Sequence, residues 1–411
     1  MIAIGKDEPD VSDNVVVLGA ARTPFGAFGG VMRDMSIPEL GSVAAKAAME
    51  RAGVEPDEID EFAMGVNLPG SDRSIARQTA LRAGVPDDRT SYTVDRACCS
   101  SLIAVSLARR GILSGDVRIA LAGGAENLSR VPYFLEGVRF GARLGDLHMS
   151  DQLVISCPHT GVARAVQASD EAAQHGVTRE MQDEWAQRSQ LLAAEAQEKG
   201  LFDVEISPVE VDDGRSQTFV ERDESVRPDS SLDALATLKT VNGSATVTAG
   251  NAPGLNTGAA FLALAAEGAA SAATSAPLAR ILATAQASGP PAKICSIPAM
   301  AVQAVLQRSG LALDDIDLFE INEAFAAVPL VTTLVLADGD LARAEKIRER
   351  TNINGGAIAL GHPTGATGVR MVMTAIASLR RAGGGRAVVA MCGGVGEGEA
   401  AVIELDAPGP P

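Results

Sequence analysis

Two segments far apart in this chain share one layout, and an internal repeat constrains the fold more than any single motif does. The first runs from Cys98 through an apolar helix and a strand to the pair Gly123-Gly124. The second runs from His362 through an apolar helix and a strand to Gly393-Gly394. Because the order loop, helix, strand and glycine pair occurs twice, we predict two similar α/β halves.

Short apolar runs such as Val15 to Leu18 and Leu318 to Ile321 alternate with helical patterns. This alternation predicts mixed sheets that are covered by helices on both faces. Between residues 127 and 256 the composition is more polar and the alternation stops, so we expect an inserted region that lies over the core and helps to build a substrate channel. The predicted units are 14–126 with 257–279, the insert 127–256, and 280–408.

The composition limits the partners of the chain. With 52 acidic and 35 basic residues the net charge is -17, which repels nucleic acid and anionic membrane surfaces at long range. A small anion can still bind where a few basic side chains or backbone N–H groups converge. The Ala-rich run from Gly258 to Ala273 is interrupted and too short to cross a membrane, and we predict a buried helix there.

The cysteines favour a reducing compartment, because they show neither paired metal-ligand spacing nor the density of a secreted disulfide framework. They are Cys98, Cys99, Cys157, Cys295 and Cys392. The N-terminus carries Asp7, Glu8 and Asp10 in place of a basic and then apolar leader. We therefore expect a cytoplasmic protein without a bound metal.

Cys98 lies where an extended stretch, Ser91 to Val94, gives way to a helix. The macrodipole and the free N–H groups of a helix N-terminus favour the thiolate, which is the nucleophilic form of cysteine. The alternative is a buried structural thiol. That alternative is what we expect of the neighbouring Cys99, which would point into the packing.

A nucleophilic cysteine needs a base, and the chain has four histidines. His362 follows the run Asn352 to Gly361, in which glycines let the backbone come close to a ligand, and Pro363 stiffens the turn. A histidine that only packs in a core would not need so much glycine. We therefore predict that His362 takes part in a reaction.

Two further groups lie at the ends of predicted strands. Cys392 ends an apolar strand and enters a glycine-rich turn, so one cysteine can hold an acyl group while the other moves a proton. Asn322 follows the strand Leu318 to Ile321. Its position favours a helix cap, and the alternative is an amide that orients a water or donates toward an oxyanion.

Taken together, these segments resemble the thiolase family over nearly the whole chain. The segment 98–102 is similar to the first signature of the family, 352–368 to its second and 392–400 to its third. The opening segment 20–26 looks like the first strand and turn of the family. The resemblance implies an α/β thiolase fold, with two βαβαβαββ halves in a five-layer αβαβα core and an inserted loop domain.

The resemblance also implies an activity, the reversible thiolytic cleavage or Claisen condensation of 3-oxoacyl-CoA and acetyl-CoA through an acyl-cysteine. Cys98 would carry the acyl group, His362 would activate it, and Cys392 would be the acid and base at the α-carbon. Two oxyanion sites are implied, one made by His362 with a water held by Asn322, the other by the backbone N–H groups of Cys98 and Gly394. Coenzyme A is then a substrate, with no permanently bound cofactor, and a homodimer or homotetramer is expected.

By the same resemblance, coenzyme A would contact residues of the insert and of the segment after residue 321. These are Arg227, at a position that can meet a phosphate, and His159, Ala249, Pro253 and Phe325. The alternative for Arg227 is a solvated surface charge. Some positions depart from the family pattern: Pro253 replaces Ser, Thr257 replaces Asp, Thr160 replaces the Met of short-chain members, and Asp95 replaces Asn.

Two other functions stay open at this point. A ketosynthase-type condensing enzyme has the same fold, but it typically pairs one Cys with two His, or with His and Asn, and lacks a second catalytic cysteine such as Cys392. A non-catalytic acyl-CoA-binding protein of this fold is suggested by the altered positions Pro253, Thr160 and Asp95.

Overall fold

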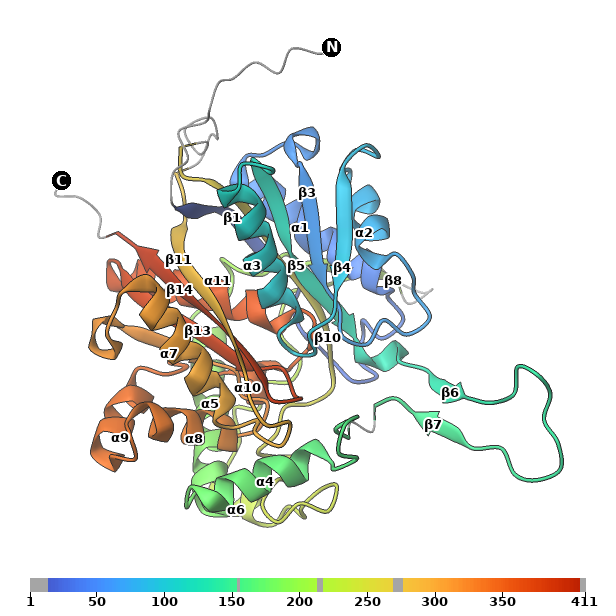
Figure 1. The fold of residues 1–411 in the computed structure, drawn as a ribbon, viewed down its shortest axis with the longest axis vertical. Helices are drawn as coiled ribbons and strands as arrows, with labels where there is room; N and C mark the ends of the chain where they lie inside the picture. The colour runs from blue at the N-terminus through green and yellow to red at the C-terminus, as the bar shows by residue number, and fades with distance from the viewer. Residues whose placement is uncertain (1–13, 154–155, 213–216, 269–275, 407–411) are drawn as a thin grey trace.

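One hydrogen-bonded sheet of ten strands runs through the molecule, which a computed structural model describes for residues 14–153, 156–212, 217–268 and 276–406 (Figure 1). The strand order is β12-β13-β14-β11-β1-β10-β5-β3-β4, and β2 pairs with β10. The strands of the first half are β1 (Val15–Arg22), β2 (Gly26–Ala27), β3 (Glu61–Gly65), β4 (Thr90–Val94), β5 (Ile119–Asn127) and β10 (Asn256–Ala266). Those of the second half are β11 (Ala279–Ser288), β12 (Leu318–Ile321), β13 (Gly385–Cys392) and β14 (Glu397–Leu405).

The two halves repeat the same strand order. The series β3-β5-β10-β1 in the first half corresponds to β12-β13-β14-β11 in the second. In the second half, the position that corresponds to β4 is occupied by an isolated parallel bridge between Phe319 and Thr351. β1 and β11 meet as antiparallel neighbours, with Val15 opposite Ile281, so this seam joins the two predicted sheets into one.

Helices cover the outer faces of both halves and fill the layer between them. α1 (Ile37–Ala52) and α2 (Ile75–Ala83) cover the first half, α7 (Ile297–Ser309) and α8 (Ala327–Leu336) cover the second, and α3 (Ser100–Leu113) and α11 (Thr367–Ala382) lie between the halves. The alternation along β1 shows the division: Val16 and Leu18 pack with α1, whereas Val15 and Val17 face the core of α3 and α11. The predicted five-layer fold is confirmed. Two short helices, α9 (Leu341–Glu349) and α10 (Ala357–Leu360), complete the second half.

Local sequence signals fix the ends of these helices. Ser36 caps α1 in a capping box with Glu39, and Gly53 ends the helix in the left-handed conformation at φ 66°. Gly383 ends α11 in the same way at φ 87°. α11 is buried on nearly all sides, which suits a helix that lies between two sheet halves.

The Ala-rich stretch after Gly258 is a strand, so the prediction of a helix there is wrong. β10 pairs with β1 on one side and with β5 on the other, and its side chains are buried on both faces. Pairing with two neighbours therefore outweighs the helix propensity of alanine. A turn follows at 267–268, and the last part of the predicted helix, 269–273, lies outside the described residues.

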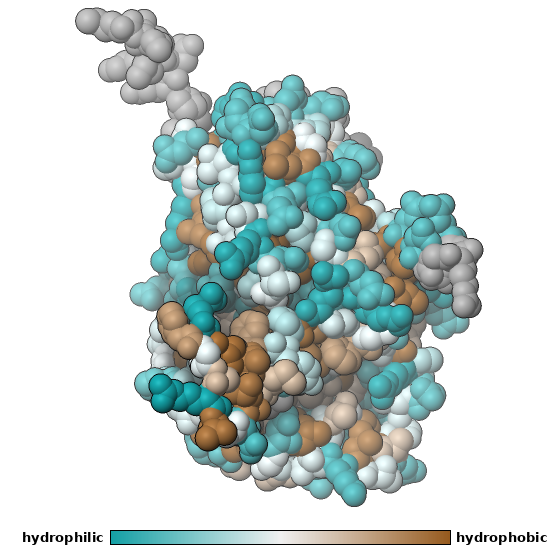
Figure 2. All heavy atoms as spheres, turned by 90° about the vertical axis from the view of Figure 1, so that its right-hand side faces the viewer, coloured by the Kyte–Doolittle hydropathy of each residue, from teal (hydrophilic) through white to brown (hydrophobic). Residues whose placement is uncertain are grey.

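The insert packs against both halves and carries a projecting hairpin. Its elements are β6 (Tyr133–Leu135), β7 (Met149–Asp151), α4 (Arg164–Gln174), α5 (Arg179–Glu198), β8 (Val209–Asp212), β9 (Gln217–Val220) and α6 (Leu232–Ala236). β6 and β7 form a ribbon that extends away from the body, and Phe140, Leu144 and Met149 are highly exposed there (Figure 1). From the side toward which the hairpin extends, apolar side chains gather between polar ones (Figure 2). None of the helices within the described ranges is both long and apolar enough to cross a membrane.

Candidate active site

The turn that carries Cys98 joins β4 to α3 and is sharply bent. Ala97 has φ 47°, a left-handed conformation that is uncommon for a residue with a Cβ. Two side chains hold the bend: Asp95 Oδ1 accepts the N–H of Ala97 at 2.9 Å, and Ser100 Oγ donates to the Ala97 carbonyl at 2.6 Å. Cys98 is half-buried in this turn, directly before the start of α3, where the sequence predicts it.

The neighbouring Cys99 connects this turn to the one that follows β13. Cys99 is fully buried, and its Sγ lies 3.7 Å from the carbonyl oxygen of Met391, so the prediction that it packs is confirmed. A Cβ added to Gly393 would lie 3.2 Å from both the Arg96 carbonyl oxygen and Cys99 Sγ. The two turns touch this closely because residue 393 has no side chain, and their contact brings Cys392 next to the Cys98 turn.

His362 is buried, and its ring is held from one side by a hydroxyl group. Nδ1 lies 2.7 Å from Thr367 Oγ1, and the Thr367 hydroxyl donates to the Pro363 carbonyl at 3.0 Å. Since the hydroxyl proton is used there, Thr367 Oγ1 accepts a hydrogen bond from Nδ1, which leaves Nε2 as the unprotonated nitrogen. The backbone N–H of His362 donates to Asn256 Oδ1 at 3.0 Å, which fixes the turn itself.

Asn322 faces His362 and does not cap a helix. Its Nδ2 lies 3.4 Å from His362 Nε2. The helix after it, α8, begins only at Ala327 with Ala326 at the cap position, so the helix-cap interpretation is wrong. The side-chain oxygen of Asn322 is buried and accepts no hydrogen bond from the described residues, and it therefore fits a water donor between the amide and a substrate.

Glu126, at the end of β5, ties the His362 turn to the first half, and the motifs did not identify it. Its carboxylate accepts hydrogen bonds from Thr364 Oγ1 at 2.6 Å and from the N–H groups of Gly365, Leu68 and Asn67 at 3.0 to 3.1 Å. A glutamate at the end of an otherwise apolar strand was the available signal. The starts of the two central helices also touch, because the Val369 N–H donates to Ser101 Oγ at 3.3 Å.

The reactive groups are uncharged at rest. Burial raises the pKa of the Cys98 thiol well above its usual range, and the nearby Cys392 raises it further. Burial also raises the pKa of Cys392 to about 11, while burial and the charge of Arg370 lower the pKa of His362 to about 3. Desolvation therefore outweighs the helix N-terminus expected to favour a thiolate, so Cys98 would need a base in order to act as a nucleophile.

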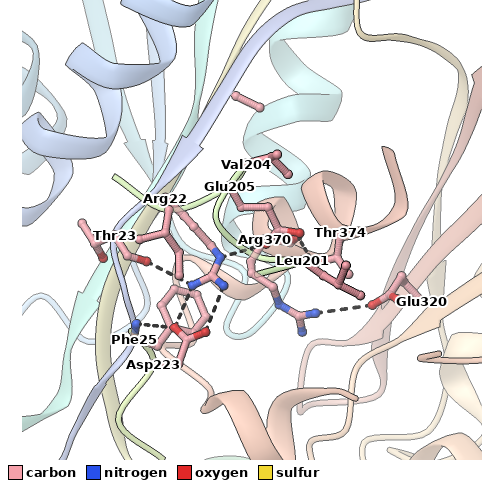
Figure 3. A network of polar contacts seen from close by, with 12 residues as sticks. Arg22, Thr23, Phe25, Leu201, Val204, Glu205, Asp223, Glu320, Arg370 and Thr374 are labelled. Atoms are coloured by element: carbon pink, nitrogen blue, oxygen red, sulfur yellow. Dashed lines mark hydrogen bonds and ion pairs between the residues drawn. The ribbon is translucent and has the colours of Figure 1, made fainter. Parts of the chain in front are cut away.

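Two buried arginines, one from each half, share a polar network with carboxylates of the insert (Figure 3). Arg22, at the end of β1, binds the carboxylate of Asp223 through two nitrogens at 2.7 and 2.9 Å and that of Glu205 at 2.9 Å. Arg370, on α11, lies 3.4 Å from Glu320 of β12. Since Asp223 and Glu205 belong to the insert, this network places the insert beside the helix that follows His362.

The residues expected to contact coenzyme A lie at the edge of the insert and near α8. Arg227, His159 and Ala249 are exposed, whereas Pro253 and Phe325 are half-buried. The loop that contains Ala249 is joined to the segment of Phe325, because the Ala326 N–H donates to the Asn251 carbonyl at 2.9 Å. The backbone N–H of Arg227 donates to Gln190 Oε1 at 2.7 Å, and the residue itself is exposed.

Arg164, the first residue of α4, lies against the Cys392 turn and was not among the predicted site residues. A Cβ added to Gly394 would lie 3.4 Å from Arg164 Nη2 and 3.6 Å from its Cζ and Nε. The Arg164 charge acts against burial on the pKa values of both Cys98 and Cys392. No local pattern marks an arginine 230 residues away from Gly394 as its neighbour, so only the fold reveals the contact.

The chain matches two family models, one described as "Thiolase, N-terminal domain" over residues 15–268 and one as "Thiolase, C-terminal domain" over residues 275–405. It is 41% identical to the acetyl-CoA acetyltransferase of Escherichia coli (strain K12), over 95% of this chain and 99% of the relative. It is 40% identical to a beta-ketoadipyl-CoA thiolase of Pseudomonas aeruginosa, over 96% of this chain and 100% of the relative. The crystal structure of human mitochondrial 3-ketoacyl-CoA thiolase in complex with CoA superposes with a TM-score of 0.89 at 37% identity, over 95% of this chain and 98% of that one.

Proposed function

The chain belongs to the thiolase family, and on that premise we propose that it makes or breaks the carbon–carbon bond of 3-oxoacyl-CoA by acyl transfer. The observation that carries the proposal is the contact between the three turns. The Cys98 turn touches the Cys392 turn, and the helices that follow Cys98 and His362 touch at their starts, which supports a site with two thiols and an imidazole whose Nε2 is unprotonated. This combination supports covalent catalysis with two proton-transfer groups.

In the first half-reaction, Cys98 gives its proton to His362 Nε2 and its sulfur attacks the carbonyl carbon of the thioester. The bond from that carbon to the coenzyme A sulfur breaks, and the leaving sulfur takes the proton of the Cys392 thiol. The acyl group is then bound to Cys98, His362 is protonated and Cys392 is a thiolate. The pKa of Cys392, raised by burial, makes the resulting thiolate a strong base.

In the second half-reaction of synthesis, the Cys392 thiolate removes a proton from the α-carbon of a second acetyl-CoA. That carbon attacks the acyl carbonyl, the bond to Cys98 breaks, and the Cys98 sulfur recovers its proton from His362. All three groups return to their starting states. Thiolysis is the reverse sequence, in which free coenzyme A accepts the acyl group.

Two sets of donors are proposed to stabilise the oxyanions of these steps. The backbone N–H of Cys98 acts on the Cys98 sulfur and that of Gly394 on the Cys392 sulfur, and both lower the pKa of the thiol concerned, which supports one oxyanion site between the two turns. Protonated His362, with a water held by the open Asn322 oxygen, forms the other. Each such donor contributes roughly 3 kcal/mol to the stability of a transition state.

Mass spectrometry after mixing with acetoacetyl-CoA tests this function. We expect an acyl adduct on Cys98 in the wild type and none in Cys98→Ala, which should lose all transfer. Cys392→Ala should still acquire the adduct from acetyl-CoA, whose coenzyme A leaves as a thiolate, but fail to make or break carbon–carbon bonds. Cys295→Ala, which removes another buried thiol, is the matched control. Absence of an adduct in the wild type would favour the binding-only alternative, and equal residual condensation in the two active-site variants would contradict the division of roles.

Coenzyme A and acyl-CoA are the proposed partners, with contacts from Arg227, His159, Ala249, Pro253 and Phe325. We also propose a homo-oligomer, which the apolar residues exposed on the β6–β7 hairpin support, and a cytoplasmic location, which five free cysteines support. Light scattering should give the mass of a dimer or tetramer. Replacing the exposed residues Phe140, Leu144 and Met149 by Ser should weaken this assembly. A monomeric wild type would contradict the proposed assembly.

A further inference from the structure

Arg164 presents a positive charge at the reactive turns, and none of the steps above uses it. The side chain is half-buried and lies over Gly394, the residue whose N–H is proposed to bind the oxyanion. Its charge is felt by the sulfurs of both Cys98 and Cys392. The guanidinium therefore lies beside the Cys392 turn and close enough to act on both sulfurs.

Arg164 forms no ion pair within the described ranges of the chain, although the protein is strongly acidic. Its side-chain hydrogen bond runs from Nη1 to Gln167 Oε1 at 3.0 Å, which leaves most of its five N–H donors for another acceptor. By contrast, Arg22, Arg179 and Arg370 each have a carboxylate within 3.4 Å.

The two buried carboxylates that act on the reactive thiols are already occupied. Glu171, two helical turns after Arg164 on the same face of α4, accepts the N–H groups of Ile294 and Cys295 at 2.8 and 2.7 Å and also binds Ser296. Lys293 lies 3.7 Å from it. Glu126 binds the four donors of the His362 turn and of the end of β3. The charge of Arg164 thus remains available to a ligand.

A guanidinium binds a carboxylate through two parallel hydrogen bonds. The uncharged methyl end of an acyl chain cannot form these bonds. The phosphates of coenzyme A are separated from its sulfur by the whole pantetheine arm, so they cannot reach a group next to Gly394 when the sulfur is at Cys98. An anionic group that meets Arg164 must therefore belong to the acyl part of the substrate, a few bonds from the reacting carbonyl.

We propose that Arg164 binds a carboxylate at the end of a short acyl chain, so that the preferred substrate is a 3-oxoacyl-CoA derived from a dicarboxylic acid. This inference rests on the proposed thiolase function and names its substrate class. Arg164 then selects the substrate, and the reacting groups are still Cys98, His362 and Cys392.

The test compares two six-carbon substrates, 3-oxoadipyl-CoA, which ends in a carboxylate, and 3-oxohexanoyl-CoA, which ends in a methyl group. We expect wild-type kcat/KM for thiolysis to be at least about tenfold higher for 3-oxoadipyl-CoA, the scale of one hydrogen bond between charged groups. Arg164→Gln should remove that preference, chiefly through a rise in KM for 3-oxoadipyl-CoA that the KM for 3-oxohexanoyl-CoA does not share. Arg164→Lys should keep part of the preference, and Arg343→Gln, on the distant helix α9, should keep all of it.

Three results would overturn the inference, each in a distinguishable way. A wild type that prefers 3-oxohexanoyl-CoA, or has no preference, contradicts the carboxylate site while the thiolase function stands. An equal loss on both substrates in Arg164→Gln means that the charge acts on the thiols and not on the acyl chain. If the wild type cleaves neither substrate with coenzyme A and acquires no acyl adduct from acetoacetyl-CoA, the proposed function itself fails. Should Arg164→Gln unfold, the wild-type preference and the Arg164→Lys variant decide.

Discussion

Thr367 Oγ1 lies 2.7 Å from Nδ1 of His362. Thr367 is the first residue of α11, and His362 lies in the turn just before this helix. The helix therefore supplies the group that sets which ring nitrogen of His362 carries the proton. Because the imidazole is buried and neutral, this choice of tautomer decides whether Nε2 can accept the proton of Cys98.

Thr367→Val should slow acylation of Cys98 without unfolding the protein. Valine keeps the shape of threonine but offers no acceptor to Nδ1–H, so His362 can adopt the wrong tautomer. We expect kcat for thiolysis to fall by about tenfold to a hundredfold, as for a lost hydrogen bond to a catalytic base. Thr367→Ser should restore most of the rate. A valine variant with wild-type kcat would show that the hydroxyl does not orient the ring.

Asn322→Ala should lower kcat by about a hundredfold, since it removes one oxyanion contribution of roughly 3 kcal/mol. The backbone N–H of residue 322 still donates to the Ala390 carbonyl, so β12 and its neighbour remain paired. Thermal unfolding should change much less than the rate. Steady-state kinetics and a melting curve on the same preparation check both statements, and unchanged kcat would remove Asn322 from the oxyanion site.

Stability should decrease as the pH falls from about 6.5 toward 3, in part because of His362. Its folded pKa is about 3, below the usual 6.5, so in this window the unfolded chain binds a proton that the folded chain does not. His362→Asn should reduce the pH dependence of the unfolding free energy by up to about 1.4 kcal/mol per pH unit. Urea titrations at several pH values measure the slope. The exposed His148 offers the control His148→Asn, which should behave as the wild type.

Asp223→Asn should destabilise the fold by roughly 3 to 5 kcal/mol, because it leaves the buried Arg22 charge without its main partner. Both side chains of this pair have no exposed surface. Asp34→Asn breaks an ion pair with Arg33 whose side chains are 60% and 89% exposed, and it should cost less than about 1 kcal/mol. Chemical denaturation of the two variants tests the difference, and similar losses would mean that the Arg22 pair does not anchor the insert.

The parts of this molecule that short-range patterns describe were predictable. Glycine, proline and the change from strand to helix mark the turns of Cys98, His362 and Cys392 in the sequence. The internal repeat predicts that the two halves have the same order of helices and strands. The wrong assignments have a common cause in tertiary structure. β10 is rich in alanine because it is enclosed on both faces, and Asn322 faces His362 because α8 begins later than local spacing suggests.

The supporting residues were not predictable, because their partners are distant in the sequence. Glu126 binds Thr364, and Arg164 lies over Gly394, and in each pair more than two hundred residues separate the members. A buried carboxylate or a half-buried guanidinium acquires its role from what the fold places opposite it. Such roles can be recognised only from the structure, whereas a nucleophile in a glycine-rich turn can be recognised from the sequence.

Cys98 and His362 occupy equivalent places in the two halves, each in the turn before the helix that fills the shared middle layer. A half-length chain would therefore own either the proposed nucleophile, Cys98, or the imidazole proposed to accept its proton, and never both. The proton of Cys98 would then have no imidazole to accept it. Only the doubled chain sets the proposed donor against the proposed acceptor, so the smallest unit of this protein able to perform the chemistry is the pair of halves, each incomplete alone.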